Sequence, residues 1–233
     1  MTDLGWIDLT LRSARPRALG ALLRYFRDLE ENSRNAHLDV TVPFGQWSGL
    51  RGSFKAGGAY QNTGRVFHER IFSITPNQNY ANDPDQYFAA ENMGVSRVDT
   101  LSGGRYRYTF GNVVTDRSKP RNNYDGDLDV AAAYAMVELP LTRRLKIIGG
   151  ARFEATRMEV VSQDSTQDVG RLDNDDVLPS LNVVYQLQDN MNLRAAATRT
   201  LARPTFREIA PFESFAFING SFFIGNPGLE RTL

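Results

Sequence analysis

Arginines able to bind carboxylates are concentrated in one short stretch, RTLARPTFREIAPF, residues 199–212. It holds three arginines, Arg199, Arg203 and Arg207, together with two prolines and two phenylalanines. A guanidinium group binds a carboxylate through two parallel hydrogen bonds, so ion pairing is the chemistry that these residues offer. Because Pro204 disfavours helix at the preceding residue, we expect Arg203 to be extended.

Pairs of carboxylates could act as a general acid and a general base, and the sequence offers two such pairs. They are Glu154 with Glu159, and Asp127 with Asp129. Each pair lies in an alternating stretch, where lining an aqueous interior is the more common role. The sequence also lacks GxSxG, a Walker loop and a GxGxxG helix entry. We therefore expect no enzyme and no cofactor.

Residue types that bind metals are few. Asp173, Asp175 and Asp176 in LDNDD suggest calcium, but the EF-hand spacing with its glycine and distal glutamate is absent. A solvated loop is therefore the favoured interpretation. His37 and His68 lie far apart in the sequence. The chain has no cysteine, which excludes disulfides and thiolate sites, so no metal site is predicted.

Net charge and hydropathy restrict the class of protein. The 27 Lys and Arg residues balance 27 Asp and Glu residues, so nothing indicates a nucleic-acid partner. No stretch approaches the ~20 apolar residues of a membrane-spanning helix. ALGALL, residues 18–23, is too short for the apolar part of a signal peptide. A search for long apolar stretches does not detect transmembrane β-barrels, because apolar and polar residues alternate along their strands of about ten residues.

Alternation of apolar and polar residues runs through most of the chain. In LKIIGGARFEATRMEV, which starts at Leu145, only Ile148 breaks the two-residue period, so we predict a strand with one apolar and one polar face. The same period marks five more stretches. Their apolar faces are Leu38, Val40, Val42 and Phe44; Leu50, Phe54, Ala56 and Tyr60; Leu128, Val130, Tyr134 and Met136; Val177, Pro179, Leu181, Val183, Tyr185 and Leu187; and Met191, Leu193, Ala195 and Ala197.

Connections between these strands alternate in length. The short ones, GQWSG, PLTRR and QDN, have turn composition, whereas residues 75–123 and 163–176 are long and polar. Short turns at one end and long loops at the other are typical of an outer-membrane barrel.

Residues 1–30 are left unassigned within a single predicted domain, residues 1–233. Leu19, Leu22 and Phe26 have helical spacing, but a strand or loop is the favoured interpretation.

Two groups of residues favour a membrane barrel over a soluble sandwich. Small residues on polar faces suit a wall that faces something bulky inside a barrel, and residues near the short turns suit a girdle at the lipid boundary. The small residues are Gly57, Ala59, Ala131, Ala133 and Ala135, and the girdle candidates are Pro43, Phe44, Trp47 and Pro140. The predicted fold is all-β: a partial antiparallel transmembrane β-barrel with long extracellular loops and short periplasmic turns.

RAAATRTLARPTFREIAPF, followed by GNPGLERT, resembles a stretch of the barrel of TonB-dependent outer-membrane receptors. In that family a strand ends in SRT.ARP.F.EL.P, and a loop then leads to GNP.L.P. The phrases AAYAMVELPLTRRLKIIGGARFEAT and FKAGGAYQNTGRVFHER resemble other family phrases, so the likeness extends from about Arg24 onward. Two departures are Ala197-Thr198 for an aromatic–serine pair and Arg231 for a proline. The matching positions are Arg199, Thr200, Ala202, Arg203, Pro204, Phe206, Glu208, Pro211, Gly225, Asn226, Pro227 and Leu229.

For the parent protein the resemblance implies energy-coupled uptake of a large, scarce solute, such as a ferric siderophore, cobalamin or an oligosaccharide. It implies as partners outer-membrane lipid, a plug domain and the TonB energy-coupling complex, and a barrel of about 22 strands. We expect no plug, TonB box or signal peptide within residues 1–233, and we expect another strand to follow Leu233. We therefore expect a fragment of a receptor from the Gram-negative outer membrane, with about six to eight strands and no activity by itself.

The resemblance places the arginine-rich segment where a strand leaves the membrane on its long-loop side. There its arginines would pair with carboxylates of the lumen or plug, and they would either stabilise the barrel rim or contact the solute. Phe206, Phe212, Phe215 and Phe217 are expected to anchor a folded outer loop.

Two other classes stay open at this point. A passive outer-membrane porin would share the strands without a plug, and a soluble all-β carbohydrate-binding protein or enzyme would bury its apolar faces in a core.

Overall fold

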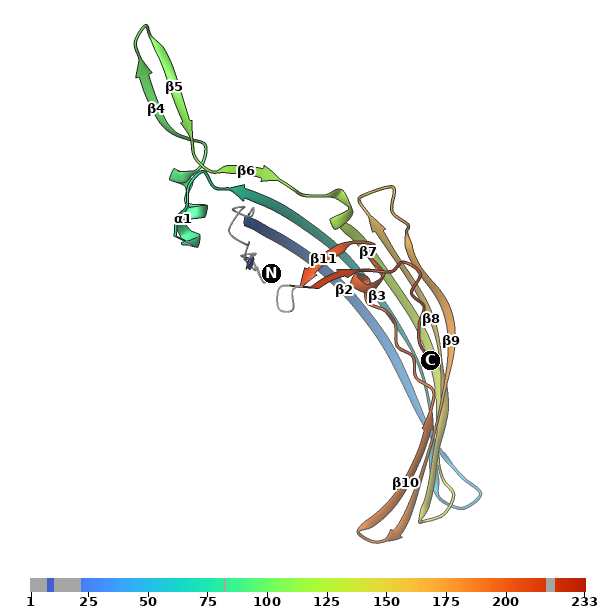
Figure 1. The fold of residues 1–233 in the computed structure, drawn as a ribbon. Helices are drawn as coiled ribbons and strands as arrows, with labels where there is room; N and C mark the ends of the chain where they lie inside the picture. Colours follow the sequence, from blue (N-terminus) through green and yellow to red (C-terminus); the bar gives the residue numbers. More distant parts are fainter. Residues whose placement is uncertain (1–7, 11–21, 82, 217–220) are drawn as a thin grey trace. The chain divides into compact units, whose positions relative to one another are not determined.

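The computed structural model describes residues 8–10, 22–81, 83–216 and 221–233, and most of them lie in antiparallel strands (Figure 1). Contacts divide the chain into two compact units. One holds Glu30–Val66, Tyr124–Phe212 and Ile224–Leu233, and it is called the sheet unit below. The other holds the described parts of Met1–Leu29, Phe67–Asn123 and Glu213–Phe223, and it is called the loop unit.

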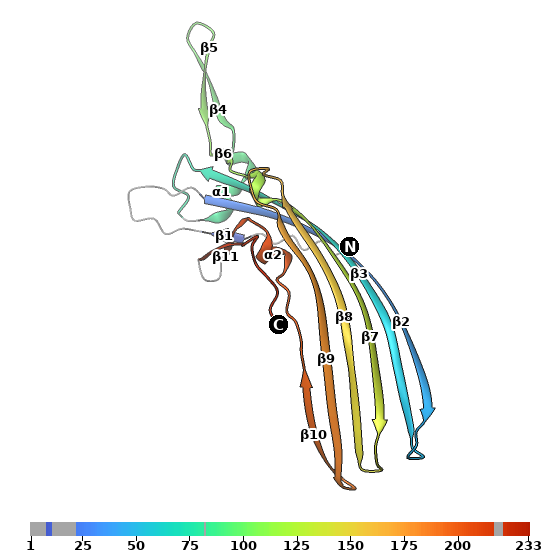
Figure 2. The ribbon, with the colours of Figure 1, turned by 90° about the vertical axis from the view of Figure 1, so that its right-hand side faces the viewer.

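Long strands follow one another as an antiparallel meander (Figure 2). The order in the eight-stranded sheet is β1-β2-β3-β7-β8-β9-β10, and β6 pairs with β3. Every neighbour along β7, β8, β9 and β10 is also the next long strand in the sequence, so each pair needs only a short connection. The bounds are β1 Asp8–Thr10, β2 Leu22–Gly45, β3 Arg51–Thr75, β6 Val113–Asp116, β7 Tyr124–Pro140, β8 Leu145–Ser162, β9 Gly170–Gln188 and β10 Met191–Thr198.

Register in the sheet unit sorts its side chains into two faces. Phe153 of β8 lies opposite Ala133 of β7 and Val177 of β9, and side chains of such partners point to the same side. This side is the bare face, because its apolar residues stay exposed: Leu193 at 60%, Val177 at 55% and Leu181 at 47%. The opposite side, which carries Glu154, is the covered face, because the chain after β10 packs on it.

Most of the predicted apolar faces prove to be the bare face. Leu181 pairs with Gly149 and Ala197, and Val183 pairs with Ile147 and Ala195. On the other strands, Leu38 and Tyr60 line the same shallow hollow as Ala131, Ala133 and Phe153. The alternating pattern therefore located this face correctly on β2, β3, β8, β9 and β10.

The assignment for β7 was wrong. Its register puts Val130 opposite Thr156 and Tyr134 opposite Arg152, so Leu128, Val130, Tyr134 and Met136 lie on the covered face. Ala131, Ala133 and Ala135, expected to line an interior, lie on the bare face. Alanine leaves both faces of β7 weakly apolar, so the sequence period alone does not distinguish them. Tyr134 is held on the covered side by Asp39, to which its hydroxyl donates a hydrogen bond.

The connection predicted at residues 163–176 is shorter than expected, because β9 begins earlier, whereas the long connection from residue 75 to residue 123 has the predicted bounds. Residues 163–169 connect β8 to β9, so the LDNDD aspartates are in strand β9 and not in a loop. The three turns β2–β3, β7–β8 and β9–β10 are as short as predicted. Residues 22–30 are strand, which rejects the helix there, while Leu19 lies outside the described residues.

The loop unit contains more regular structure than its sequence indicated. Besides β1, β6 and the ends of β2 and β3, its elements are α1 Pro84–Phe88, η1 Ala90–Asn92, β4 Val95–Leu101, β5 Arg105–Phe110, η2 Pro120–Asn122, β11 Glu213–Ala216 and the start of β12 Ser221–Ile224. Buried Asn112 links its parts: the amide oxygen accepts from the backbone N–H of Asn77 and the hydroxyl of Tyr80, and its NH₂ donates to the carbonyl of Tyr87. None of the described helices is long and apolar enough to cross a membrane.

Candidate functional site

After β10 the chain folds back onto the covered face of the sheet unit. We call residues 199–212 and 224–233 the strap. Two of its side chains, Phe206 and Ile209, are buried against two glycines of the sheet. A Cβ atom at Gly126 would lie 2.6 Å from the Phe206 ring, and one at Gly170 would lie 2.0 Å from Cγ2 of Ile209. Glycine at these two strand positions therefore permits the close approach of the strap.

A single helical turn, α2 (Phe206–Ile209), directs Phe206 and Ile209 toward the sheet. Thr205 and Glu208 form a capping box: the Thr205 backbone N–H donates to Glu208 Oε2 at 2.7 Å. This backbone hydrogen bond, with one from the Thr205 hydroxyl, lowers the pKa of Glu208. The capping box fixes the direction in which Phe206 leaves the backbone.

The second half of the strap turns beside α2. The N–H of Asn226 donates to the carbonyl of Glu208 at 2.7 Å. A Cβ at Gly225 would lie 1.8 Å from the carbonyl oxygen of Ala210, so only glycine fits between the two chain segments. The turn is closed by the Asn226 side chain, whose Oδ1 accepts from the N–H of Gly228 at 3.0 Å.

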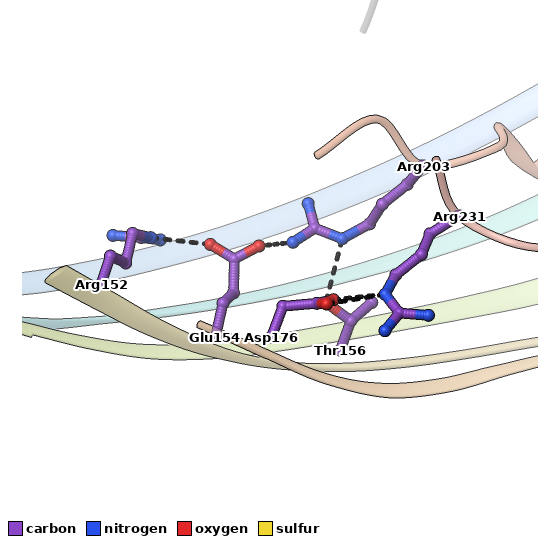
Figure 3. A network of polar contacts seen from close by, with 6 residues as sticks. All are labelled: Arg152, Glu154, Thr156, Asp176, Arg203 and Arg231. Atoms are coloured by element: carbon purple, nitrogen blue, oxygen red, sulfur yellow. Dashed lines mark hydrogen bonds and ion pairs between the residues drawn. The ribbon is translucent and has the colours of Figure 1, made fainter. Parts of the chain in front are cut away.

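Charged side chains connect the strap to β8 (Figure 3). Glu154, with a side chain only 8% exposed, accepts from Nε of Arg152 at 2.7 Å and is also ion-paired with Arg203. Arg203 in turn donates from Nε to the Thr156 hydroxyl at 2.9 Å. One carboxylate therefore serves two guanidinium groups, one from the sheet and one from the strap.

A second ion pair connects the end of the strap to β9. Arg231 Nε lies 2.8 and 2.7 Å from the two oxygens of Asp176, and Nη1 donates to Asn174 at 2.6 Å. Asp176 is buried. Both carboxylate oxygens share the one Nε–H of Arg231. Charge-assisted hydrogen bonds are stronger than neutral ones, so Arg231 ties the end of the strap to β9.

A match over almost the whole sequence assigns the chain to a protein family. Residues 4–232 match the family described as TonB dependent receptor-like, beta-barrel. The chain belongs to this family. A curated relative, "Uncharacterized protein R00370" of Rhizobium meliloti (strain 1021), is 77% identical over 30 residues. That stretch covers 13% of this chain and 7% of the relative, so the chain matches only a small part of that protein's length.

TonB-dependent receptors are outer-membrane transporters rather than enzymes, and the complete receptor works with a plug domain and TonB. The match confirms the predicted family and the partial all-β barrel fold. It also opposes the soluble carbohydrate-binding alternative, which would have enclosed the apolar residues that the bare face exposes.

The receptor motif positions account for most of the strap's contacts. Ala202 exchanges two backbone hydrogen bonds with Thr232, and Arg199 donates its backbone N–H to Pro179. Arg203 makes the expected ion pair, and buried Phe206 and Phe212 anchor the strap as predicted. Thr200, Pro204 and Pro211 lie in irregular segments between these contacts, and Pro227 lies in a turn. The side chains of Phe215 and Phe217 lie outside the described ones.

The two carboxylate pairs considered from the sequence lie differently in the sheet. Glu154 and Glu159 lie on opposite faces of β8, because they are five residues apart in a strand. Asp127 and Asp129 share the bare face and so do not line the covered side; Asp129 accepts from Tyr60 at 2.6 Å. Among the described residues, no group of three or more His, Asp or Glu side chains could hold a metal ion.

Sequence reasoning missed the partners Arg152, Thr156 and Asp176, and it treated Arg231 only as a departure from the family pattern. The available signal was polarity: Arg152, Glu154 and Thr156 are polar residues at every second position of β8, on one face.

Proposed function

We propose that this chain forms part of the lipid-facing wall of a receptor for energy-coupled uptake of a large, scarce solute. Ferric siderophores, cobalamin and oligosaccharides are the solute classes that we infer from the family. The observation that carries the proposal is the bare face, on which large apolar side chains stay exposed instead of forming a core. Hydrocarbon tails of the outer membrane are the solvent that such a face fits.

The length of the apolar band supports this proposal. On β8 it runs from Leu145 to Ala155, about the 9–11 residues that a tilted strand needs to cross a bilayer. Immediately beyond it the bare face becomes charged. Arg157 lies 3.6 Å from Asp173, and Arg171 lies 2.9 Å from Glu159. Such a change from apolar to charged rows is expected where lipid tails give way to headgroups and water.

At the opposite border of the apolar band, near the short turns, an aromatic residue lies where an aromatic girdle is expected. Trp47, in the short turn between β2 and β3, is 87% exposed, and Phe44 ends the apolar face of β2. Tryptophan prefers the boundary between hydrocarbon and water. We therefore propose that this turn lies at the periplasmic surface, with the strap serving the outer side.

We propose that residues 1–233 act as one barrel-wall domain whose partners are lipid, a plug domain and the TonB complex. Taken alone, the described sheet leaves the far edge of β10 without a strand partner. Unpaired backbone groups are costly in lipid, so the chain by itself is expected to move no solute across a membrane.

Flotation with vesicles tests the lipid-facing assignment. The chain is refolded with and without phosphatidylcholine vesicles and centrifuged through a density gradient, and strand content is read by circular dichroism. We expect strand signal and flotation together with vesicles, and aggregation without them. A folded, monodisperse monomer in detergent-free buffer would contradict the proposal.

A further inference from the structure

An open cavity of about 410 Å³ lies on the covered face where the strap leaves β10. Its polar lining comes from β8, from the end of β10 and from the first residues of the strap: Arg152, Glu154, Thr198, Arg199, Thr200 and Arg203. We propose that this cavity binds an oxyanion, the carboxylate or phosphate group of a small soluble solute.

Positive charge in the cavity exceeds negative charge. Three guanidinium groups line it against the single carboxylate of Glu154. Arg199 is exposed, and its side chain has no ion-pair partner among the described residues. The Arg199 side chain can therefore bind an incoming anion without breaking an existing ion pair.

The one carboxylate is already engaged. Glu154 accepts a hydrogen bond from Arg152 on one side and is ion-paired with Arg203 on the other (Figure 3). Burial, and then the neighbouring charge of Arg152, lower the pKa of Arg203, as expected where cations outnumber anions. An added oxyanion would relieve this imbalance.

The geometry is preorganised on the sheet side. Glu154 and the Thr156 hydroxyl fix the guanidinium of Arg203, while Arg152 remains 39% exposed and can reach a ligand with its remaining N–H groups. Thr198, at the end of β10, and Thr200 of the strap add hydroxyl groups. Planar guanidinium groups bind carboxylate and phosphate oxygens in pairs, so this lining fits an oxyanion better than a neutral solute.

Calorimetric titration of the folded chain in detergent tests the site with two probes, tricarballylate and inorganic phosphate. Arg199→Gln should weaken binding of both by about tenfold to a hundredfold, the usual effect of losing a charged hydrogen bond. Arg194→Gln is the matched control, since Arg194 is an exposed arginine of β10 that does not line the cavity. The Arg194 variant should change the affinity for each probe by less than about twofold, because Arg194 attracts the anion only over a long distance and salt screens that attraction.

Three results would overturn the proposal: no heat of binding with either probe, equal losses in the two variants, or equally tight binding of the neutral trimethyl ester of tricarballylate. Circular dichroism of each variant separates lost binding from lost folding. The titration does not need lipid, so the site can be confirmed even if flotation contradicts the membrane assignment.

Discussion

Replacing Leu181 by arginine is expected to destabilise the chain folded in bilayers by about 2–4 kcal/mol. Leu181 lies in the middle row of the apolar band on the bare face, between Gly149 of β8 and Ala197 of β10. If hydrocarbon covers this row, an arginine there must lose its hydration or deform the bilayer. Urea titration in vesicles, followed by circular dichroism, measures the change in the free energy of unfolding.

The control places the same side chain beyond the band. Asp175 lies on the same face of β9, opposite Ala155, at the border where the charged rows begin. Asp175→Arg should cost no more than about 1 kcal/mol, because arginine near the interface keeps its water. Equal costs at the two positions would show that no hydrocarbon layer distinguishes them.

Replacing Phe206 by alanine is expected to lower the free energy of unfolding by about 3–5 kcal/mol. The ring is 4% exposed, it fills the space above Gly126, and the guanidinium of Arg65 lies 5.0 Å from its centroid. Alanine would leave a cavity that the capped turn and the sheet cannot close, because both are fixed by hydrogen bonds. The same urea titration provides the measurement.

Phe54→Ala is the matched truncation for this second variant. Phe54 is on the bare face and 43% exposed, so its loss opens no cavity and lipid fills the space. We expect its cost to be clearly smaller than that of Phe206→Ala. If the two truncations cost the same, the strap does not pack on the sheet as described.

The sequence predicted the strands well where the two faces differ strongly in polarity. On β8 and β9 bulky apolar residues alternate with Arg, Glu, Asn and Ser, so the alternation assigns the apolar face of each strand without ambiguity. On β7 three alanines on one side and Val130, Tyr134 and Met136 on the other leave both faces compatible with lipid. The register with β8 determines which face of β7 is the bare face, and the local pattern of residues does not specify that register.

The strap was recognisable from its sequence, but its partners were not. The density of arginine, proline and phenylalanine in residues 199–212 indicated a folded segment with ion pairs. Arg203 binds Thr156 and Arg231 binds Asp176 across 47 and 55 residues of chain, respectively. Contacts at such separations depend on how β8, β9 and the strap align in space, and no local signal specifies that alignment.

Covering of the bare face by hydrocarbon is the central claim, and fluorescence quenching tests it most directly. In a background without the two native tryptophans (Trp6→Phe, Trp47→Phe), one tryptophan is introduced at Leu181 or at its neighbour Asn182. Successive residues of β9 point to opposite faces, so vesicles with brominated acyl chains should quench Leu181→Trp strongly and Asn182→Trp weakly. Equal quenching of the two, or stronger quenching at position 182, would contradict a lipid-covered bare face.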